Sequence, residues 1–170
     1  MMSSNMRITV SPKKIVRFSK TYVSFYTKYS SVVFKTLRKP LFQKFLDWVL
    51  KRENIKEHKV TNVQIMVFPF RKENGKGLAG KCNRKGEIFI YPKRLEFCRK
   101  LLRNCGKEKV YSFIKNRARA TLIHELLHIK YSSDEEKVRK LTRKYFKIFT
   151  RHQNTQNSNA HNILKMVFTQ

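Results

Sequence analysis

The sequence predicts a single α+β domain with a small mixed sheet. Its 170 residues suffice for one hydrophobic core, and the apolar share of 41% is ordinary for a globular chain. Residues 60–70 and 86–92 carry apolar side chains at alternate positions, a pattern typical of strands. Most other segments repeat apolar residues every three or four positions, which is typical of helices. We therefore expect a few strands packed against several helices.

Residues 1–39 are expected to form a basic N-terminal extension. Aromatic and apolar residues recur there at helical spacing, with Lys and Arg between them, from Ile15 to Thr36. This pattern predicts a helix, and we favour one that packs on the core. The alternative is a helix that offers the same face to a partner or to a membrane surface.

Residues 40–150 are expected to form the main domain. Pro40 suits the first turn of a helix that ends near Glu53. The segment between the two strands contains four of the five glycines and is expected to be a loop. Three further helices are expected at residues 94–104, 107–131 and 134–149. Residues 151–170 are expected to be a polar tail with a short apolar end, and we consider that this end folds over the site and keeps the protein latent.

The charge of the chain is extreme, with 39 Lys and Arg against 11 Asp and Glu, a net charge of +28. Such a surface attracts polyanions, so non-specific nucleic-acid binding is one expected interaction. The three cysteines are odd in number and form no CxxC pair, which argues against a disulfide framework. Neither a transmembrane run nor the apolar core of a signal peptide is found, so we expect a cytoplasmic protein.

Residues 124–128 read HELLH within the longest helical pattern. A helix places residues four apart on one face, so His124 and His128 can direct both imidazoles at one zinc ion. Glu125 lies beside that face, where it can reach a water on the metal. The alternative is a pair of core histidines with local hydrogen bonds. We favour the zinc site because an unpartnered pair of histidines and an acid would be costly on a buried helix.

A zinc site with one open position needs a third protein ligand. The nearest acids are at positions 134, 135 and 136, at the start of the last expected helix. Helical geometry turns Glu136 outward, and the sequence from Ser133 to Glu136 resembles a capping box. We favour Glu135 as the third ligand because its side chain is longer, and we keep Asp134 as the alternative.

HELLHIKY followed by a helix that begins DEEKV resembles the gluzincin group of zinc peptidases, and the small size is similar to the single-domain archaeal minigluzincins. The likeness covers residues 60–149. It implies a zincin-like domain with a backing helix, an active-site helix and a following glutamate helix. It also implies that His124, His128 and Glu135 hold zinc and that Glu125 is the general base. In that group a strand lines the cleft and pairs with the substrate, and GEIFIYP at residues 86–92 is in the corresponding place.

The function predicted from these features is hydrolysis of a peptide or protein by water that zinc and Glu125 activate. The donor for the oxyanion stays open among Tyr131, Tyr145, His152 and His161. Cys82 is a further, less favoured zinc ligand in a latent form. The rival hypothesis is a basic nucleic-acid-binding protein with a structural or vestigial zinc site, for which no fourth ligand is evident near the motif.

Overall fold

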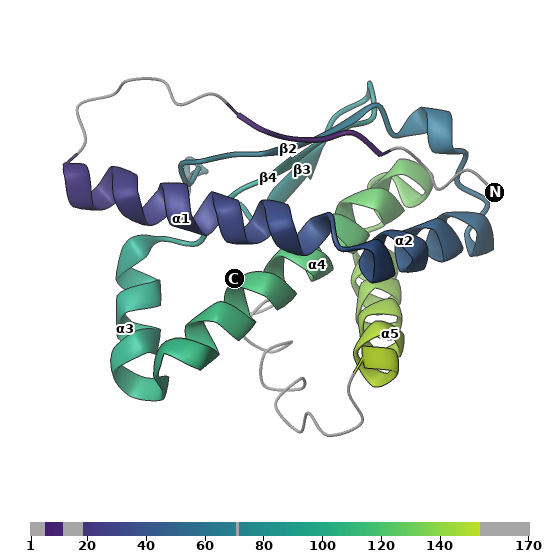
Figure 1. The fold of residues 1–170 in the computed structure, drawn as a ribbon. Coiled ribbons are helices and arrows are strands. Elements are labelled where there is room, and N and C mark those ends of the chain that lie inside the picture. Colours follow the sequence, from purple (N-terminus) through teal and green to yellow (C-terminus); the bar gives the residue numbers. More distant parts are fainter. Residues whose placement is uncertain (1–5, 12–18, 71, 154–170) are drawn as a thin grey trace.

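A computed structural model describes residues 6–11, 19–70 and 72–153 (Figure 1). In chain order the elements are β1 (Ile8–Val10), α1 (Lys20–Leu37), α2 (Pro40–Arg52), the short 3₁₀ helix η1 (Glu57–Lys59), β2 (Asn62–Ile65), β3 (Gly80–Cys82), β4 (Glu87–Ile90), α3 (Leu95–Cys105), α4 (Lys107–Tyr131) and α5 (Glu135–Gln153). The expected helices and the two expected strands are all present. Together they form a small α+β domain, as predicted.

The four strands form one mixed sheet in the order β1-β2-β4-β3. The first three are parallel to one another, and β3 runs antiparallel to β4 at the edge. Both β1 and β3 were missed by the sequence reasoning, and β3 lies inside the segment expected to be a loop. Each has only three residues, too few to show an alternating pattern. Their pairing depends on β2 and β4, which lie far from them in the sequence.

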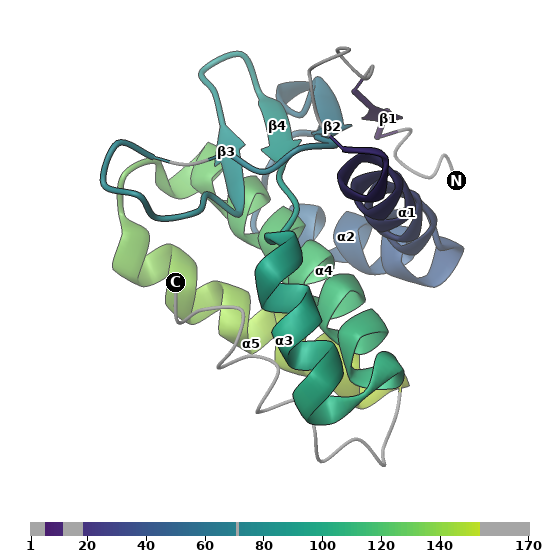
Figure 2. The same cartoon turned by 90° about the vertical axis from the view of Figure 1, so that its left-hand side faces the viewer.

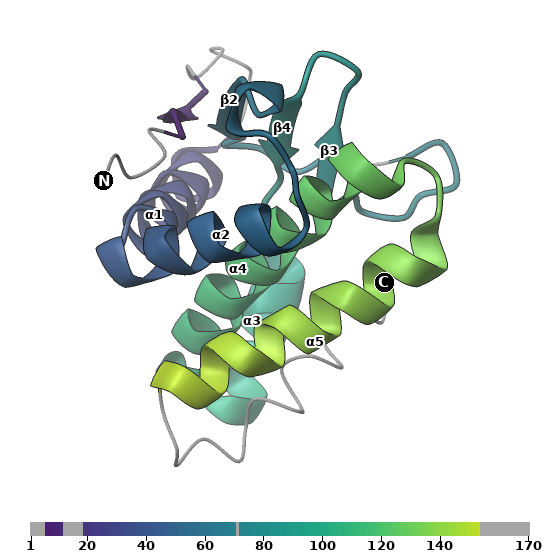
Figure 3. The same cartoon turned by 90° about the vertical axis from the view of Figure 1, so that its right-hand side faces the viewer.

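The sheet has one face against the helices. Figures 1, 2 and 3 show the strands on one side of the molecule and the five α-helices on the other. Alternate residues of β2 and β4 are buried, while the residues between them, such as Gln64 and Phe89, are half-buried. This is the period-two pattern expected of a sheet covered on one face. The buried set is Val63, Ile65, Ile88 and Ile90.

Helix α4 is the centre of the domain, because it contacts α1, α3, α5, β3 and β4. Its middle carries twelve buried residues, which explains why its sequence shows no single polar face. The positions around the HELLH motif are held rigidly by this burial. Leu122, Ile123, Leu126 and Leu127 are fully buried there.

The N-terminal segment is part of this core. Strand β1 pairs with β2, and α1 packs against α4, so the expectation of a helix packed on the core is confirmed. The sequence spacing placed Phe25, Tyr29, Val32 and Thr36 on the inner face. Tyr29 and Thr36 are buried, while Phe25 and Val32 are only half-buried, and the buried face extends to Tyr26, Val33 and Leu37. Residues 12–18 lie outside the described part.

No helix in the described ranges is long and apolar enough to cross a membrane. The expected apolar end of the tail, together with His161, lies outside the described residues.

Candidate metal centre

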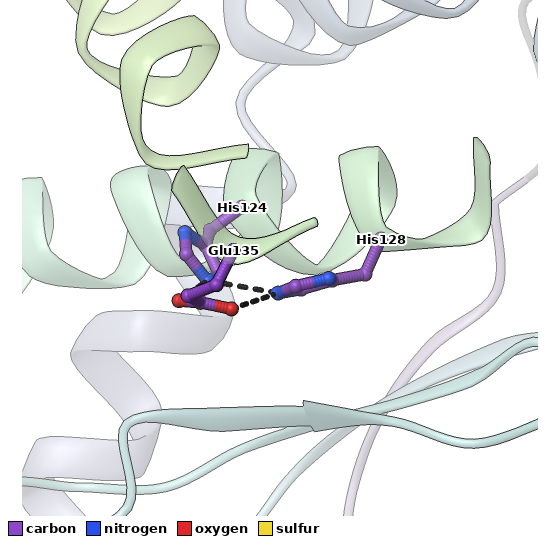
Figure 4. A group of neighbouring side chains, drawn as sticks. All are labelled: His124, His128 and Glu135. Carbon is purple, nitrogen blue, oxygen red and sulfur yellow. Dashed lines mark hydrogen bonds and ion pairs between the residues drawn. The ribbon is translucent and has the colours of Figure 1, made fainter. Parts of the chain in front are cut away.

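Helix α4 places His124 and His128 one turn apart on the face that looks toward the start of α5 (Figure 4). Their side chains are 16% and 18% exposed. The two Nε2 atoms lie 3.1 Å apart. The i, i+4 spacing of the motif has therefore brought both imidazoles to one point, as the sequence predicted.

The hydrogen bonds of the far ring nitrogens define the tautomers. Nδ1 of His128 lies 2.6 Å from the carbonyl oxygen of Ser132, which can only accept, so this nitrogen carries the proton. Nδ1 of His124 lies 3.5 Å from Oγ1 of Thr142, whose own proton goes to the carbonyl of Val138. In neutral rings with these tautomers, each Nε2 atom carries the lone pair that a metal ion can accept. Burial lowers the pKa of His124 to about 4, so this ring is neutral near pH 7.

The carboxylate of Glu135 completes the cluster. Its oxygens lie 3.1 Å from Nε2 of His124 and 2.9 Å from Nε2 of His128. Nε of Arg139, one helical turn further along α5, lies 3.2 Å from the same carboxylate and orients it. In the described part of the chain, these are the side chains that gather ligand atoms for a metal ion: His124, His128 and Glu135.

The geometry of the cluster fits a metal ion. Two nitrogens that bind one tetrahedral zinc at ~2.0–2.1 Å lie about 3.3 Å apart, close to the 3.1 Å between the Nε2 atoms of His124 and His128. Two lone pairs at that separation repel each other unless a cation or a proton lies between them. The nearby carboxylate of Glu135 adds negative charge at the same point. Two imidazoles and one carboxylate are a donor set that zinc and related divalent ions accept.

Asp134, the alternative third ligand, has a structural role instead. Its carboxylate accepts a hydrogen bond from the backbone N–H of Lys137 at 3.2 Å, and it thereby caps α5. The cap predicted at Ser133 is therefore wrong by one residue. Because α5 begins at Glu135, that side chain leaves the first turn toward the histidines, while Glu136 is exposed. Asp134 is not among the clustered ligands.

Glu125 lies next to the cluster and is 6% exposed. Its pKa is raised to about 8, chiefly by burial and also by the negative charge of Glu135, while the positive charge of Lys72 opposes both. A carboxyl group with a pKa near neutrality can accept and return a proton, which general acid-base catalysis requires.

This raised pKa predicts a pH-dependent stability for the metal-free protein. The folded state favours protonated Glu125, so its stabilising contribution is complete below about pH 4.5 and is lost as the pH rises through 8. Metal-free Glu125→Gln is expected to unfold with a free energy higher than wild type by on the order of 2–4 kcal/mol at pH 8, and by little at pH 5. Urea unfolding of chelator-treated protein at both pH values measures this. Glu108→Gln, at the exposed start of α4, is the control, and an equal gain in that variant would contradict the assignment.

Gly80 of β3 makes the closest approach of the sheet to this helix face. A Cβ atom at position 80 would lie 2.6 Å from Cγ2 of Thr121 and 3.0 Å from Cγ and Oε1 of Glu125. Only glycine leaves room for the Glu125 side chain to lie between α4 and β3. The sequence carried no signal of this contact, since a glycine in a loop-like segment has many ordinary explanations.

Gly80→Ala is therefore expected to lower the free energy of unfolding by about 1–3 kcal/mol, the usual cost of overpacking. Gly77→Ala is the matched control, because a Cβ atom there meets nothing within 4 Å, and its effect is expected to stay within about 0.5 kcal/mol. Thermal and urea unfolding of the two variants compare them. Equal stabilities would show that Glu125 and Thr121 move aside freely.

The cluster opens into a cleft of about 1060 Å³ between α4, β3 and the start of α5. Its wall is rich in cations that the sequence reasoning did not place: Lys59, Lys72, Lys81, Arg84, Lys85 and Arg139. Arg139 was the one that sequence could have indicated, since it lies four residues after Glu135 on a helix. Cys82 also lines the cleft without joining the ligand cluster, and burial raises the pKa of its thiol to about 11.

Among the described strands, β3 is at the edge of the sheet beside the cleft, so one of its backbone edges is unpaired there. The resemblance pointed to residues 86–92 for the strand that lines it, and this is wrong, because β4 is paired on both sides, with β2 and β3. Backbone groups of Ala79 and Asn83 are hydrogen-bonded toward β4. By alternation, those of Gly80 and Cys82 face the open side of the sheet.

Two of the expected oxyanion donors are committed elsewhere. The hydroxyl of Tyr131 donates to Oε2 of Glu53 at 2.5 Å, and that of Tyr145 donates to Oε1 of the same carboxylate. His152 lies at the exposed end of α5 and does not line the cleft. In place of these three, the cleft offers Lys72 and Arg139 as cationic groups near the cluster.

Glu53 joins the end of α2 to the end of α4 and to the middle of α5. It lies at the end of α2 and is 7% exposed, and Lys130 donates to its backbone carbonyl at 2.5 Å. Burial alone would raise the pKa of Glu53, but hydrogen bonds from Tyr131 and Tyr145 and the charge of Lys130 outweigh it and lower that pKa. These bonds fix the turn between α4 and α5. They thereby fix the position of Glu135 on α5 relative to His124 and His128 on α4.

Comparisons with protein-family models, curated proteins and solved structures found no match. Fold and site together define the class as a small α+β protein with a His-His-Glu cluster that can bind a metal ion.

Proposed function

We propose that this chain is a zinc-dependent peptide hydrolase. The observation that carries the proposal is the convergence of two imidazole lone pairs and the Glu135 carboxylate within about 3 Å, beside the buried carboxyl of Glu125. Zinc bound there would polarise the scissile carbonyl and acidify a water. The resemblance of HELLH and DEEKV to the gluzincins supports the same function.

The residues of the chain have separate tasks in this reaction. His124, His128 and Glu135 hold the metal, and Glu125 takes a proton from the attacking water and returns it to the leaving amine. An extended peptide can pair with the free backbone edge at Gly80. This edge runs past Glu125, so a paired peptide would pass the site of chemistry.

The open coordination position favours catalysis over a structural role. A closed structural zinc site has four protein ligands, and the cluster formed by the described residues has three. The rival hypothesis of a nucleic-acid-binding protein rests on the net charge of +28 and on the basic aromatic helix expected at residues 15–37. The described part of that helix, α1, packs against α4, and the charge is compatible with either function.

The first test is the metal content of the purified protein by mass spectrometry. About one zinc per chain is expected in wild type and in His152→Ala, which removes an exposed histidine outside the cleft. His124→Ala is expected to lose the metal. Wild-type protein that takes up no zinc from excess would overturn the site.

The second test is hydrolysis of casein and of a mixed peptide library by the zinc-loaded protein. Activity should disappear with a chelator and return with zinc. Zinc-loaded protein that cleaves no peptide in the library would overturn the hydrolase while leaving the metal site established.

A further inference from the structure

A second cavity, of about 430 Å³, lies at the start of α3. It is bounded by the segment 69–77, the connection from β4 to α3 and the middle of α4 (Figure 2 shows α3 starting directly below β4). Its walls share Gly77 with the metal cleft, and none of the clustered ligands reaches it. Its volume is within the range of small-ligand sites.

Arg117 of α4 forms part of this wall and is only 2% exposed. Nη1 donates to the carbonyl of Tyr91 at 2.6 Å and lies 3.5 Å from the hydroxyl of Tyr29. Nε is buried and has no hydrogen-bond partner. No ion pair joins Arg117 to a carboxylate within the described ranges. A buried guanidinium without a counter-charge is costly, so an anion bound beside it would be stabilising.

Further cations line the same cavity. Lys76, Lys93 and Arg94 are there, against the single acid Glu96, which is exposed. The pKa of Lys93 is lowered to about 8, chiefly by burial and also by the positive charge of Arg117. Positive charge is therefore concentrated in a partly closed space, and the described residues form no ion pair with these cations.

The first turn of α3 adds backbone donors. Its N-cap residue, Arg94, makes no side-chain cap, and the guanidinium of Arg94 instead donates to the carbonyl of Gly75 at 2.7 Å. The N–H of Leu95 is bonded to the hydroxyl of Tyr26 at 2.9 Å. The next amides, of Glu96 and Phe97, belong to residues that line the cavity and lie in the uncapped first turn.

We propose that this cavity binds an oxyanion, a phosphate group or a carboxylate, between the side chains of Arg117, Lys93 and Arg94 and the uncapped first turn of α3. The buried guanidinium supplies the fixed charge, and the helix amides supply directed donors. Such a site requires neither zinc nor hydrolysis, so this proposal does not depend on the proposed function.

The test is a titration of ¹⁵N-labelled full-length, metal-free protein with inorganic phosphate, and separately with acetate, at constant ionic strength. Saturable shifts are expected at the amides of Glu96 and Phe97. Arg94→Gln and Lys93→Met are each expected to weaken binding by at least about tenfold, since each removes a charged donor. Lys100→Gln, which removes the same charge from an exposed position of α3 outside the cavity, is expected to leave it unchanged.

The phosphate and acetate titrations distinguish the two kinds of anion. Saturation by phosphate alone assigns a phosphate group, and comparable saturation by acetate assigns a carboxylate. Shifts that grow linearly and spread over the basic surface would overturn the proposal. Equal weakening in Lys100→Gln and Arg94→Gln would overturn it too. In either case Arg117 would serve only to fasten the end of β4 through Tyr91.

Discussion

Glu125→Gln is expected to bind zinc as wild type does and to hydrolyse peptides about 10³-fold more slowly. Glutamine keeps the shape of the side chain between α4 and β3 but cannot accept a proton from water. The ligand atoms belong to other residues, so the zinc content should remain at one per chain. The measurement is kcat on a cleaved peptide with metal content determined on the same sample.

The matched control is Glu108→Gln, which removes an acid from the exposed first turn of the same helix. It should retain wild-type kcat. If Glu125→Gln keeps more than about a tenth of the wild-type rate with zinc bound, Glu125 is not the general base. If that variant also loses zinc, its carboxyl contributes to holding the metal, and the separation of roles proposed above fails.

The second large effect is expected on zinc affinity when Glu135, the proposed third ligand, is removed. Glu135→Ala is expected to weaken zinc binding by more than about 100-fold, because even outer-shell partners are worth about 10–100-fold. The loss follows from the contacts of 3.1 and 2.9 Å that its carboxylate makes with the two imidazoles. A competition titration with a zinc-chelating dye measures it.

Asp134→Ala is the control at the neighbouring residue, and it is expected to change stability rather than zinc affinity. It removes the cap of α5 and should cost about 1 kcal/mol of stability, with little change in zinc affinity. If Asp134→Ala loses the metal while Glu135→Ala keeps it, the ligand is the aspartate. Unfolding measurements on both variants separate lost stability from lost binding.

Much of the candidate site followed from local sequence. His124, Glu125 and His128 lie in one unbroken helical pattern, so their relative directions depend only on the geometry of α4. Helical angles excluded Glu136, and the longer side chain favoured Glu135 over Asp134. The capping residue, however, was placed one position too early. A cap depends on backbone conformation at the turn, which residue types indicate only within a residue or two.

The strands show which parts of the fold local sequence patterns do not predict. Segments 62–65 and 87–90 alternate clearly because they lie in the middle of the sheet and bury one face against helices. Strands β1 and β3 lie at its two edges and have three residues each, so their sequences carry almost no pattern. The order of the strands decides which edge is free, and this depends on contacts between segments far apart in the chain.

By itself the sequence determined the helices, the α+β class and one helix face with two imidazoles and an acid, because these depend on spacing along the chain. Tertiary structure alone decided the rest. It brought Glu135 to the two imidazoles. It placed Glu125 against Gly80 and raised the pKa of Glu125. It also joined Tyr131 and Tyr145 to Glu53 by hydrogen bonds. Burial and the approach of distant charges produce each of these effects, and neither is a property of neighbouring residues.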